Sequence, residues 1–343
     1  MKIGNDTPFE VEALPFLDLE GKAFLTVIVK GTFTIVPEGI AAVAEAQIPI
    51  LFGDEPGDTE KGGAPKFEAD TAPFKPRADI LLVGKAHAPG GKPVRWLDAG
   101  LRVGTLQKVV RVSGDRAWIS GGGKLSAPVS TEPEPFTEMP LVYEKAFGGI
   151  DTESGGFCAE NPAGCGFYTR KSPKNIDGAP LPNIEDASRP IRSWTDHPAP
   201  AGFGPIAKGW APRDRYLGTY DELWKSERSP LPPNDFRYDF YNAAPPALQV
   251  EGYLRGDEEV LLLNLEKSGK ARFRLPGIVP IATVEKTERW SGPSWNEPAP
   301  MRLDTLCLLP DEGRLFLVWR GRCPLTDLSA LEVETVRIVA STP

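Results

Sequence analysis

The distribution of proline constrains the fold of this chain more than any other feature. Of the 36 prolines in 343 residues, 18 fall between residues 128 and 246. Proline lacks a backbone donor and has a fixed φ, so neither a long helix nor a central strand can run through that stretch. The same stretch keeps many aromatic residues, in which a disordered linker would be poor. We therefore expect residues 128–246 to form long, ordered loops pinned by aromatic side chains.

The two flanking parts have the pattern of β-strands. Residues 23–36 are rich in β-branched and aromatic residues and predict one long strand, with a bulge or bend at Gly31. Two hairpins are expected next, around residues 89–92 and around residues 113–115. In the last hundred residues, hairpin turns are expected at residues 256–257 and 311–313, and strands at residues 247–254, 259–265, 271–275, 302–309 and 314–320.

Similar strand patterns at both ends predict one β scaffold with the proline-rich centre laid across it. The expected fold is mainly β, an antiparallel sandwich or barrel-like scaffold with a long loop-dominated central insertion and few short helices. One helix is predicted where Thr219–Glu222 has the capping-box pattern and Ser229-Pro230 ends the segment. We expect a single elaborated β domain over residues 1–343, made of N-terminal strands (1–127), central loops (128–246) and C-terminal strands (247–343).

The charge pattern excludes some classes of partner. The formal net charge of −8 lies in the first 70 residues, where five lysines face thirteen acidic residues. No block of lysine and arginine marks a track for nucleic acid, and we expect no such partner. The N-terminus lacks the apolar stretch of a signal peptide, and no apolar run approaches the length of a membrane span. A cytoplasmic protein without a membrane partner is therefore expected.

Residue types that form common reaction centres are sparse. The cysteines at positions 158, 165, 307 and 323 fit neither a zinc site nor a disulfide framework, and we expect loop or buried thiols, with an approach of Cys158 to Cys165 left open. The two histidines complete no metal motif; His87 is expected to be hydrogen-bonded in a strand and His197 to lie in a solvated loop. The run Gly121-Gly122-Gly123-Lys124 lacks the spacing of a phosphate-binding loop and is interpreted as a turn. We expect no enzyme activity, cofactor or metal.

The central loops carry the composition of a recognition surface. Residues 200–213 bring an arginine close to two large aromatic residues, a combination that is enriched at protein-interface anchors. A simple covering of the β core by these aromatic side chains is the competing interpretation. The predicted partner-binding residues are Trp194, Phe203, Trp210 and Arg213.

Eight segments that occur in order along the chain resemble those of a known family. They are Asn5–Phe9, Phe74–Ile80, His87–Gly91, Tyr143–Gly149, Glu160–Gly164, Pro182–Glu185, Asn242–Pro246 and Leu254–Glu258. Over nearly its whole length the chain resembles a bacterial family of domains of unknown function that is encoded in type VI secretion clusters, often beside spike and toxic effector genes. One departure is visible, because relatives often carry a polar residue, commonly Asp, after the double proline, where this chain has Ala247.

The resemblance implies a non-catalytic adaptor or chaperone that binds a secreted effector protein and helps to load it onto the spike protein. It supplies no catalytic residues to transfer. The alternative is a carbohydrate-binding or carbohydrate-active β scaffold, in which tryptophans stack on sugar rings and loop carboxylates act. The candidates for those roles are Trp194, Trp210, Trp224, Glu160 and Glu185. A purely structural component of the secretion machinery is a third hypothesis, which the lack of a heptad pattern disfavours.

Overall fold

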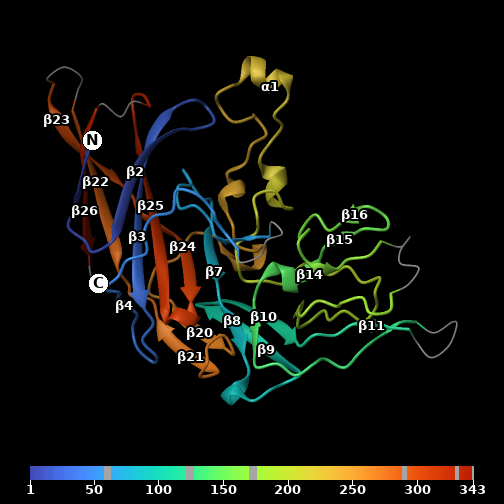
Figure 1. The fold of residues 1–343 in the computed structure, drawn as a ribbon. Helices are drawn as coiled ribbons and strands as arrows, with labels where there is room; N and C mark the ends of the chain where they lie inside the picture. Colours follow the sequence, from blue (N-terminus) through green and yellow to red (C-terminus); the bar gives the residue numbers. More distant parts are fainter. Residues whose placement is uncertain (58–62, 121–126, 170–175, 288–291, 329–331, 342–343) are drawn as a thin grey trace.

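A seven-stranded sheet joins the two ends of the chain (Figure 1). The structure is a computed structural model that describes residues 1–57, 63–120, 127–169, 176–287, 292–328 and 332–341. All neighbouring strands of the sheet are antiparallel except β7 and β24, which are parallel. In spatial order the strands are β19 (Gln249–Val250), β7 (Ala78–Leu82), β24 (Arg302–Leu309), β25 (Arg314–Pro324), β3 (Ala23–Thr34) and β2 (Glu10–Leu17), with β4 (Ala42–Val43) added to β3.

Strand β3 is buried along almost its whole length, as its position between β2 and β25 requires. Side chains alternate between the two faces of a strand. One face of β3 is apolar, whereas the other carries Thr26, Lys30 and Thr32, all buried. Their polar atoms bond to the segment 47–73, for example from Thr26 Oγ1 to the carbonyl of Pro73 at 2.9 Å. The prediction of one long strand is confirmed, and both of its faces are covered.

Gly31 does not mark a bulge, contrary to the sequence prediction. The pairing of β3 with β25 continues through Gly31 opposite Leu317 without a shift of register. A Cβ atom at this position would lie 2.9 Å from the Phe9 ring and 3.0 Å from the Phe33 ring. Glycine is therefore required by the close packing of two aromatic rings on the strand, which local sequence does not reveal.

A four-stranded sheet packs against the large sheet and makes the scaffold sandwich-like (Figure 1). Its inward residues, including Val284 and Ile338, belong to the same buried cluster as Leu25 and Trp319 of the large sheet. The β1–β26 pair is parallel and the other pairs are antiparallel. In spatial order the strands are β1 (Lys2–Asn5), β26 (Val333–Ser341), β22 (Val279–Thr287) and β23 (Ser294–Ala299).

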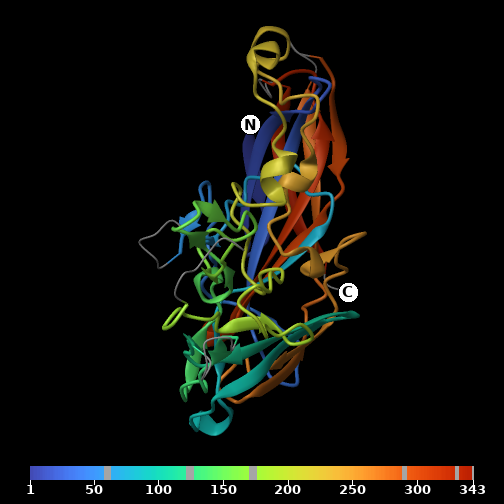
Figure 2. The ribbon, with the colours of Figure 1, turned by 90° about the vertical axis from the view of Figure 1, so that its right-hand side faces the viewer.

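A five-stranded antiparallel sheet lies at one end of the large sheet, at the bottom of Figures 1 and 2. Its longest hairpin turns at Gly104 and Thr105, since Val103 pairs with Leu106. The two hairpins that the sequence predicts around residues 89–92 and 113–115 are therefore wrong, because neither of those segments links paired strands. The strands are β18 (Ile184–Asp186), β10 (Leu106–Ser113), β9 (Trp96–Val103), β20 (Glu259–Leu263) and β21 (Lys270–Arg274).

The proline-rich centre consists of loops, short strand pairs and short helices that lie beside the scaffold (Figure 1). Ring contacts pin these loops, such as the edge-on packing of Tyr143 against Trp210, with ring centroids 5.7 Å apart. The remaining strand pairs are β5 (Glu55–Pro56) with β6 (Pro65–Phe67), β8 (Lys85–His87) with β13 (Glu138–Pro140), β11 (Trp118–Ile119) with β12 (Val129–Ser130), β14 (Phe147–Gly148) with β17 (Cys165–Gly166), and β15 (Ile150–Asp151) with β16 (Gly156–Phe157).

Within the described ranges, the α-helical structure is limited to α1 (Glu222–Glu227). The predicted helix is thus confirmed, but its cap is Asp221, whose side chain accepts a hydrogen bond from Trp224 N. Thr219, predicted as the cap, instead donates to Asp235 at 2.8 Å. No helix in this part of the chain is long and apolar enough to cross a membrane. The 3₁₀-helices are η1 (Pro89–Gly91), η2 (Tyr143–Lys145), η3 (Arg213–Tyr216), η4 (Tyr238–Tyr241), η5 (Pro246–Leu248) and η6 (Pro310–Glu312).

The mainly β, sandwich-like fold class is therefore confirmed. At the C-terminal end, β24 has the predicted bounds, and the turn at residues 311–313 joins it to β25. Residues 256–257 do not form a hairpin turn, because β19 pairs with β7 and β20 pairs with β9 and β21. Residues 247–254 contain only the two-residue strand β19. The run Gly121-Gly122-Gly123-Lys124 lies outside the described residues.

Candidate functional site

A cavity of about 830 Å³ opens beyond the carboxyl ends of β7 and β24, and we call it the end groove. The chain leaves β7 through Val83 and Gly84 and leaves β24 through η6, so both strand ends supply part of the lining. The opposite wall comes from η2 and from loops of the central insertion, including Pro180 and Pro205. The end groove therefore lies where the insertion meets the edge of the scaffold.

Apolar side chains make up much of the wall that the insertion provides. Leu141 and Leu181 are buried at its base, and Val142 remains 40% exposed. Tyr143 is buried, and its hydroxyl group donates to the carbonyl of Gly204 at 3.4 Å. Burial raises the pKa of the Tyr143 hydroxyl far above its ordinary value, so this group stays neutral. The wall thus offers apolar surface with few fixed charges.

A cluster of charged groups borders the groove on the scaffold side. His87 Nε2 lies 2.6 Å from Asp311 Oδ1, and its Nδ1 lies 3.6 Å from Glu138 Oε1. Lys85 pairs with Glu138 at 2.9 Å, and this lysine holds the pKa of the Glu138 carboxyl below its usual value. His87 lies in β8 and is hydrogen-bonded to Asp311 of η6, so the prediction of a hydrogen-bonded histidine in a strand is confirmed. His197, which is exposed, donates from Nε2 to the carbonyl of Tyr168 at 2.8 Å.

The thiol that lines the groove, that of Cys165, is not activated as a nucleophile. Burial raises the pKa of this thiol to about 11, so the protonated form dominates at neutral pH. All four cysteines are free thiols, and Cys158 and Cys165 are not joined. No group of three or more His, Cys, Asp or Glu side chains in the described segments is arranged to hold a metal ion.

Two of the segments that carry the family resemblance, residues 143–149 and 160–164, meet at Asn161. Their contacts hold η2 in position. The Asn161 amide donates to the carbonyl of Tyr143 at 2.7 Å and to that of Phe147 at 3.0 Å. Gly148 has a φ of 152° and passes so close that a Cβ atom there would lie 2.1 Å from the carbonyl oxygen of Asn161. Any larger residue at position 148 would displace this loop. The contacts fix Tyr143 and hence the wall of the end groove.

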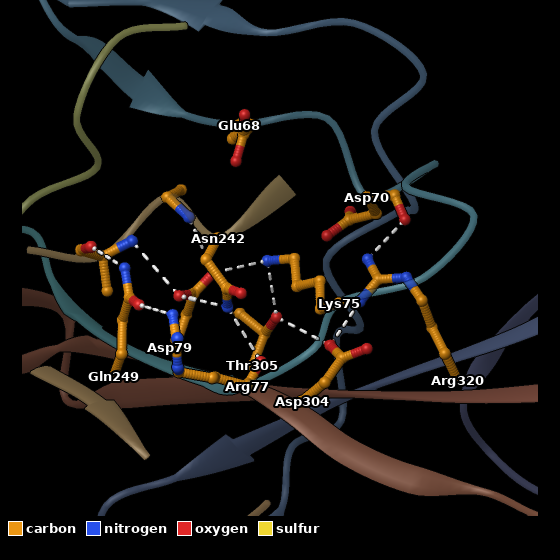
Figure 3. A network of polar contacts seen from close by, with 12 residues as sticks. Glu68, Asp70, Lys75, Arg77, Asp79, Asn242, Gln249, Asp304, Thr305 and Arg320 are labelled. Carbon is orange, nitrogen blue, oxygen red and sulfur yellow. Dashed lines mark hydrogen bonds and ion pairs between the residues drawn. The ribbon is translucent and has the colours of Figure 1, made fainter. Parts of the chain in front are cut away.

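Two further such segments meet at Asp79, at the start of β7 (Figure 3). This carboxylate is fully buried and is bonded to four donors. Lys75 Nζ lies 2.7 Å from Oδ2, and Asn242 Nδ2 lies 3.0 Å from Oδ1. The backbone N–H groups of Ala243 and Ala244 donate to the same carboxylate at 2.9 and 3.2 Å. Asp79 therefore joins the central insertion to the main sheet.

The polar network continues across the sheet from Lys75 to Asp70 (Figure 3). Lys75 Nζ donates to Thr305 Oγ1 at 3.1 Å, and Thr305 Oγ1 donates to Asp304 Oδ1 at 2.9 Å. Arg320 pairs with Asp304 and also donates to the carbonyl of Asp70 at 2.6 Å.

The chain of contacts ends at Lys30 Nζ, 2.7 Å from Asp70 Oδ2. Positive and negative groups alternate along this path, so each buried charge has a partner.

Three of the four predicted partner-binding residues lie inside the fold. The exposed fraction is 0% for Phe203, 7% for Trp210 and 2% for Arg213. Arg213 donates to Glu68 Oε1 at 2.5 Å and to the carbonyl of Phe240 at 2.7 Å. These side chains offer a partner almost no surface and cover the core, which was the competing interpretation. Burial raises the pKa of the Glu68 carboxyl, although Arg213 acts in the opposite direction.

Trp194 is half-buried against a small satellite cluster of Trp118, Ile176 and Leu181, and it is the member of the predicted set that keeps some surface. Of the residues named for sugar binding, Trp224 and Glu185 are engaged within the protein. Trp224 donates its indole N–H to the carbonyl of Leu231 at 2.8 Å. Glu185 is buried and pairs with Arg116 at 2.8 Å, whereas Glu160 is exposed.

Sequence reasoning missed most of the residues that build the groove and the network. Lys75, Asp79, Asn161 and Asn242 all lie in the resembling segments, and this was the signal that marked them. Ala247, where relatives often carry a polar residue, is exposed in η5 and takes no part in the network.

The fold and this geometry define a class of mainly β proteins in which a large central insertion is held on the scaffold by a buried polar network and forms a groove at its edge. A family model described as an uncharacterized protein conserved in bacteria, DUF2169, matches residues 20–320. The chain belongs to this family. Neither the curated proteins nor the solved structures compared with the chain include a match.

Proposed function

We propose that this protein is a non-catalytic adaptor or chaperone that binds a type VI secretion effector and helps to load it onto the spike. The single observation that supports this proposal best is the end groove, which lies between the scaffold and the insertion. Its volume of about 830 Å³ is within the range of ~300 to 1,000 Å³ that is usual for ligand sites. The link to type VI secretion itself comes from the resemblance of the eight segments.

The chemistry of the groove suits a short segment of a protein. Val142, Pro180 and Pro205 offer apolar surface to side chains of such a segment. Lys85 and Asp311, at the scaffold side, offer charged groups of both signs for its backbone or polar side chains. An apolar wall with a polar border is the usual anatomy of a protein-binding surface.

The walls are held in place before any ligand arrives. Asn161 holds η2 and the following strand β14 through one carbonyl group each, and Asp79 holds the insertion through three donors of residues 242–244. A site that is ordered in advance loses less conformational entropy on binding than a flexible one. This favours a holder of cargo over a surface that must fold around it.

Copurification from the native cell tests the proposal. Tagged protein is isolated from a lysate, and the proteins that accompany it are identified by mass spectrometry. We expect an effector and a spike protein to be recovered together. Failure to recover either one, with the neighbouring effector and spike genes expressed, would contradict the adaptor function. Recovery of neither, together with binding in a glycan screen, would favour the carbohydrate alternative instead.

A further inference from the structure

A second cavity, of about 500 Å³, lies at the opposite end of β24 from the end groove, and we call it the arginine groove. It is bordered by the start of β3, by the segment 73–75, by Tyr253, by the start of β24 and by the end of β25. None of the functions discussed above uses it. Its lining has a composition unlike that of the chain as a whole.

The lining of the arginine groove is strongly cationic. It contains Lys22, Lys75, Arg302, Arg320 and Arg322, against two carboxylates, those of Asp18 and Asp304. The whole chain, by contrast, has a net charge of −8.

Lys75 and Arg320 are already paired with Asp79 and Asp304 inside the network. Arg302 and Arg322 are exposed, and no carboxylate of the described residues lies within ion-pair distance of either one. Two guanidinium groups are therefore available to an anion.

Aromatic rings hold both free guanidinium groups in place. The Arg322 guanidinium lies over the Phe24 ring, 4.0 Å from its centroid, and 5.4 Å from the centroid of Phe74. The Arg302 guanidinium lies 5.0 Å from the centroid of Tyr253, whose hydroxyl group donates to the carbonyl of Lys75 at 2.7 Å. Stacking of this kind orients the planar donors of arginine, so less entropy is lost when they bind a carboxylate or a phosphate.

One of the lining arginines, Arg320, also keeps a donor that is unpartnered within the described part of the chain. The side chain of Arg320 is 4% exposed, and its Nε atom is buried without a hydrogen-bond partner among the described residues. Its other two nitrogens bond to Asp304 and to the carbonyl of Asp70. An unpartnered donor at this depth has a free-energy cost that a bound acceptor or water would remove.

The walls select among anionic ligands. Phe24, Phe74 and Tyr253 contribute aromatic surface, and Pro73, Pro300 and Pro324 contribute further apolar surface. A nucleic-acid strand would extend beyond the groove. There, the net negative charge of the rest of the protein would repel its phosphate groups. A peptide can place a few carboxylates on the arginines and apolar side chains on the rings. We propose that the arginine groove binds an acidic peptide segment of a partner protein, with neighbouring carboxylates and flanking apolar residues.

A fluorescence-anisotropy titration tests this proposal with a labelled peptide of about ten residues that contains four Glu and two Leu. The comparison peptide has Gln in place of each Glu. We expect the acidic peptide to bind and its affinity to fall as salt is added, because the contact is a charged one. The double variant Arg302→Gln, Arg322→Gln should bind it at least about tenfold more weakly, which is about 1.4 kcal/mol.

Matched variants distinguish this site from general attraction to surface arginines. Arg255 and Arg337 have side chains that are 79% and 69% exposed and do not line the groove. The double variant Arg255→Gln, Arg337→Gln should bind the acidic peptide as the unchanged protein does. Both double variants replace exposed side chains, and circular dichroism checks that they fold.

Three results would overturn the proposal. They are equal binding of the Gln peptide, unchanged affinity in the Arg302→Gln, Arg322→Gln variant, and binding of inorganic phosphate at this site without binding of the acidic peptide. The copurification described above does not depend on this groove, so the two proposals can fail separately.

Discussion

The Nζ atom of Lys75 lies 2.7 Å from Oδ2 of Asp79, with 5% of the lysine side chain and none of the aspartate side chain exposed. Asp79 also accepts from three groups of the segment 242–244. Removal of one partner from a buried pair leaves an uncompensated charge in a region of low dielectric constant. The pair therefore controls how firmly the insertion is held on the sheet.

Replacement of Asp79 by Asn should lower the free energy of unfolding by about 3 to 5 kcal/mol, because Lys75 then keeps a buried charge without its partner. Urea denaturation followed by tryptophan fluorescence measures the change. Glu222 provides a matched control, since its side chain is 92% exposed and its ion pair with Lys225 is long, at 3.9 Å. The change Glu222→Gln should alter the unfolding free energy by no more than about 0.5 kcal/mol. A loss of unfolding free energy below about 1 kcal/mol for Asp79→Asn would show that the charge of Lys75 is not buried and dependent on Asp79.

Replacement of Gly31 by Ala should destabilise the protein by about 1 to 3 kcal/mol, since the added methyl group would overlap the Phe9 and Phe33 rings. The second change Phe9→Leu should restore part of that loss by making room. Gly209→Ala is the control, because nothing lies within 4 Å of a Cβ atom there. Thermal unfolding of the four proteins would decide the matter, and equal effects of the two glycine changes would argue against the tight contact.

Replacement of Val142 by Glu should reduce the amount of effector that copurifies by about tenfold or more, because a charge would then stand on the apolar wall of the end groove. Val109 is a close match in exposure, at 42% against 40%, but lies on β10 outside the groove. Val109→Glu should leave the recovery unchanged. The same yield of effector with both variants would show that the effector does not bind in the end groove.

Lys108 provides a test by pH. Burial lowers the pKa of its amino group from 10.5 to about 8, against the opposing effect of Asp186. The folded state therefore holds fewer protons than the unfolded state between these two values, and stability rises with pH across that window. Relative to the variant Lys108→Met, the unchanged protein should gain up to about 3 kcal/mol between pH 8 and 10.5. Unfolding free energies of both proteins at several pH values measure this difference. If the difference does not change with pH, the amino group of Lys108 is exposed to water rather than buried.

Strands with a dense local pattern could be predicted from the sequence. The region of β3 and the bounds of β24 follow from runs of β-branched and apolar residues between turn formers. The pairing of strands could not be predicted, because it depends on contacts between distant segments. Thus β7, β8 and β9 follow one another in the chain but belong to three different sheets. A reading of nearby segments as hairpins misses such connections.

The candidate site was harder to predict for a related reason. Arg213 lies next to aromatic residues in the sequence, a composition typical of exposed anchors, but its partner Glu68 is 145 residues away. Likewise, Asp79 and Asn242 are separated by 163 residues. Burial of a charged residue depends on its partner, and no local pattern records a partner so distant.

The central place of β3 has a consequence for how the protein is made. This strand needs β25 as its second neighbour, and Phe24 pairs with Pro324 at the far end of the chain. At ~5 to 20 residues per second, a ribosome takes roughly 15 to 55 s to make the intervening stretch of about 280 residues. During that time an apolar strand has one open edge, the kind of surface that invites aggregation. The large sheet therefore cannot close until β25 has been made, and the open edge of β3 needs protection until then.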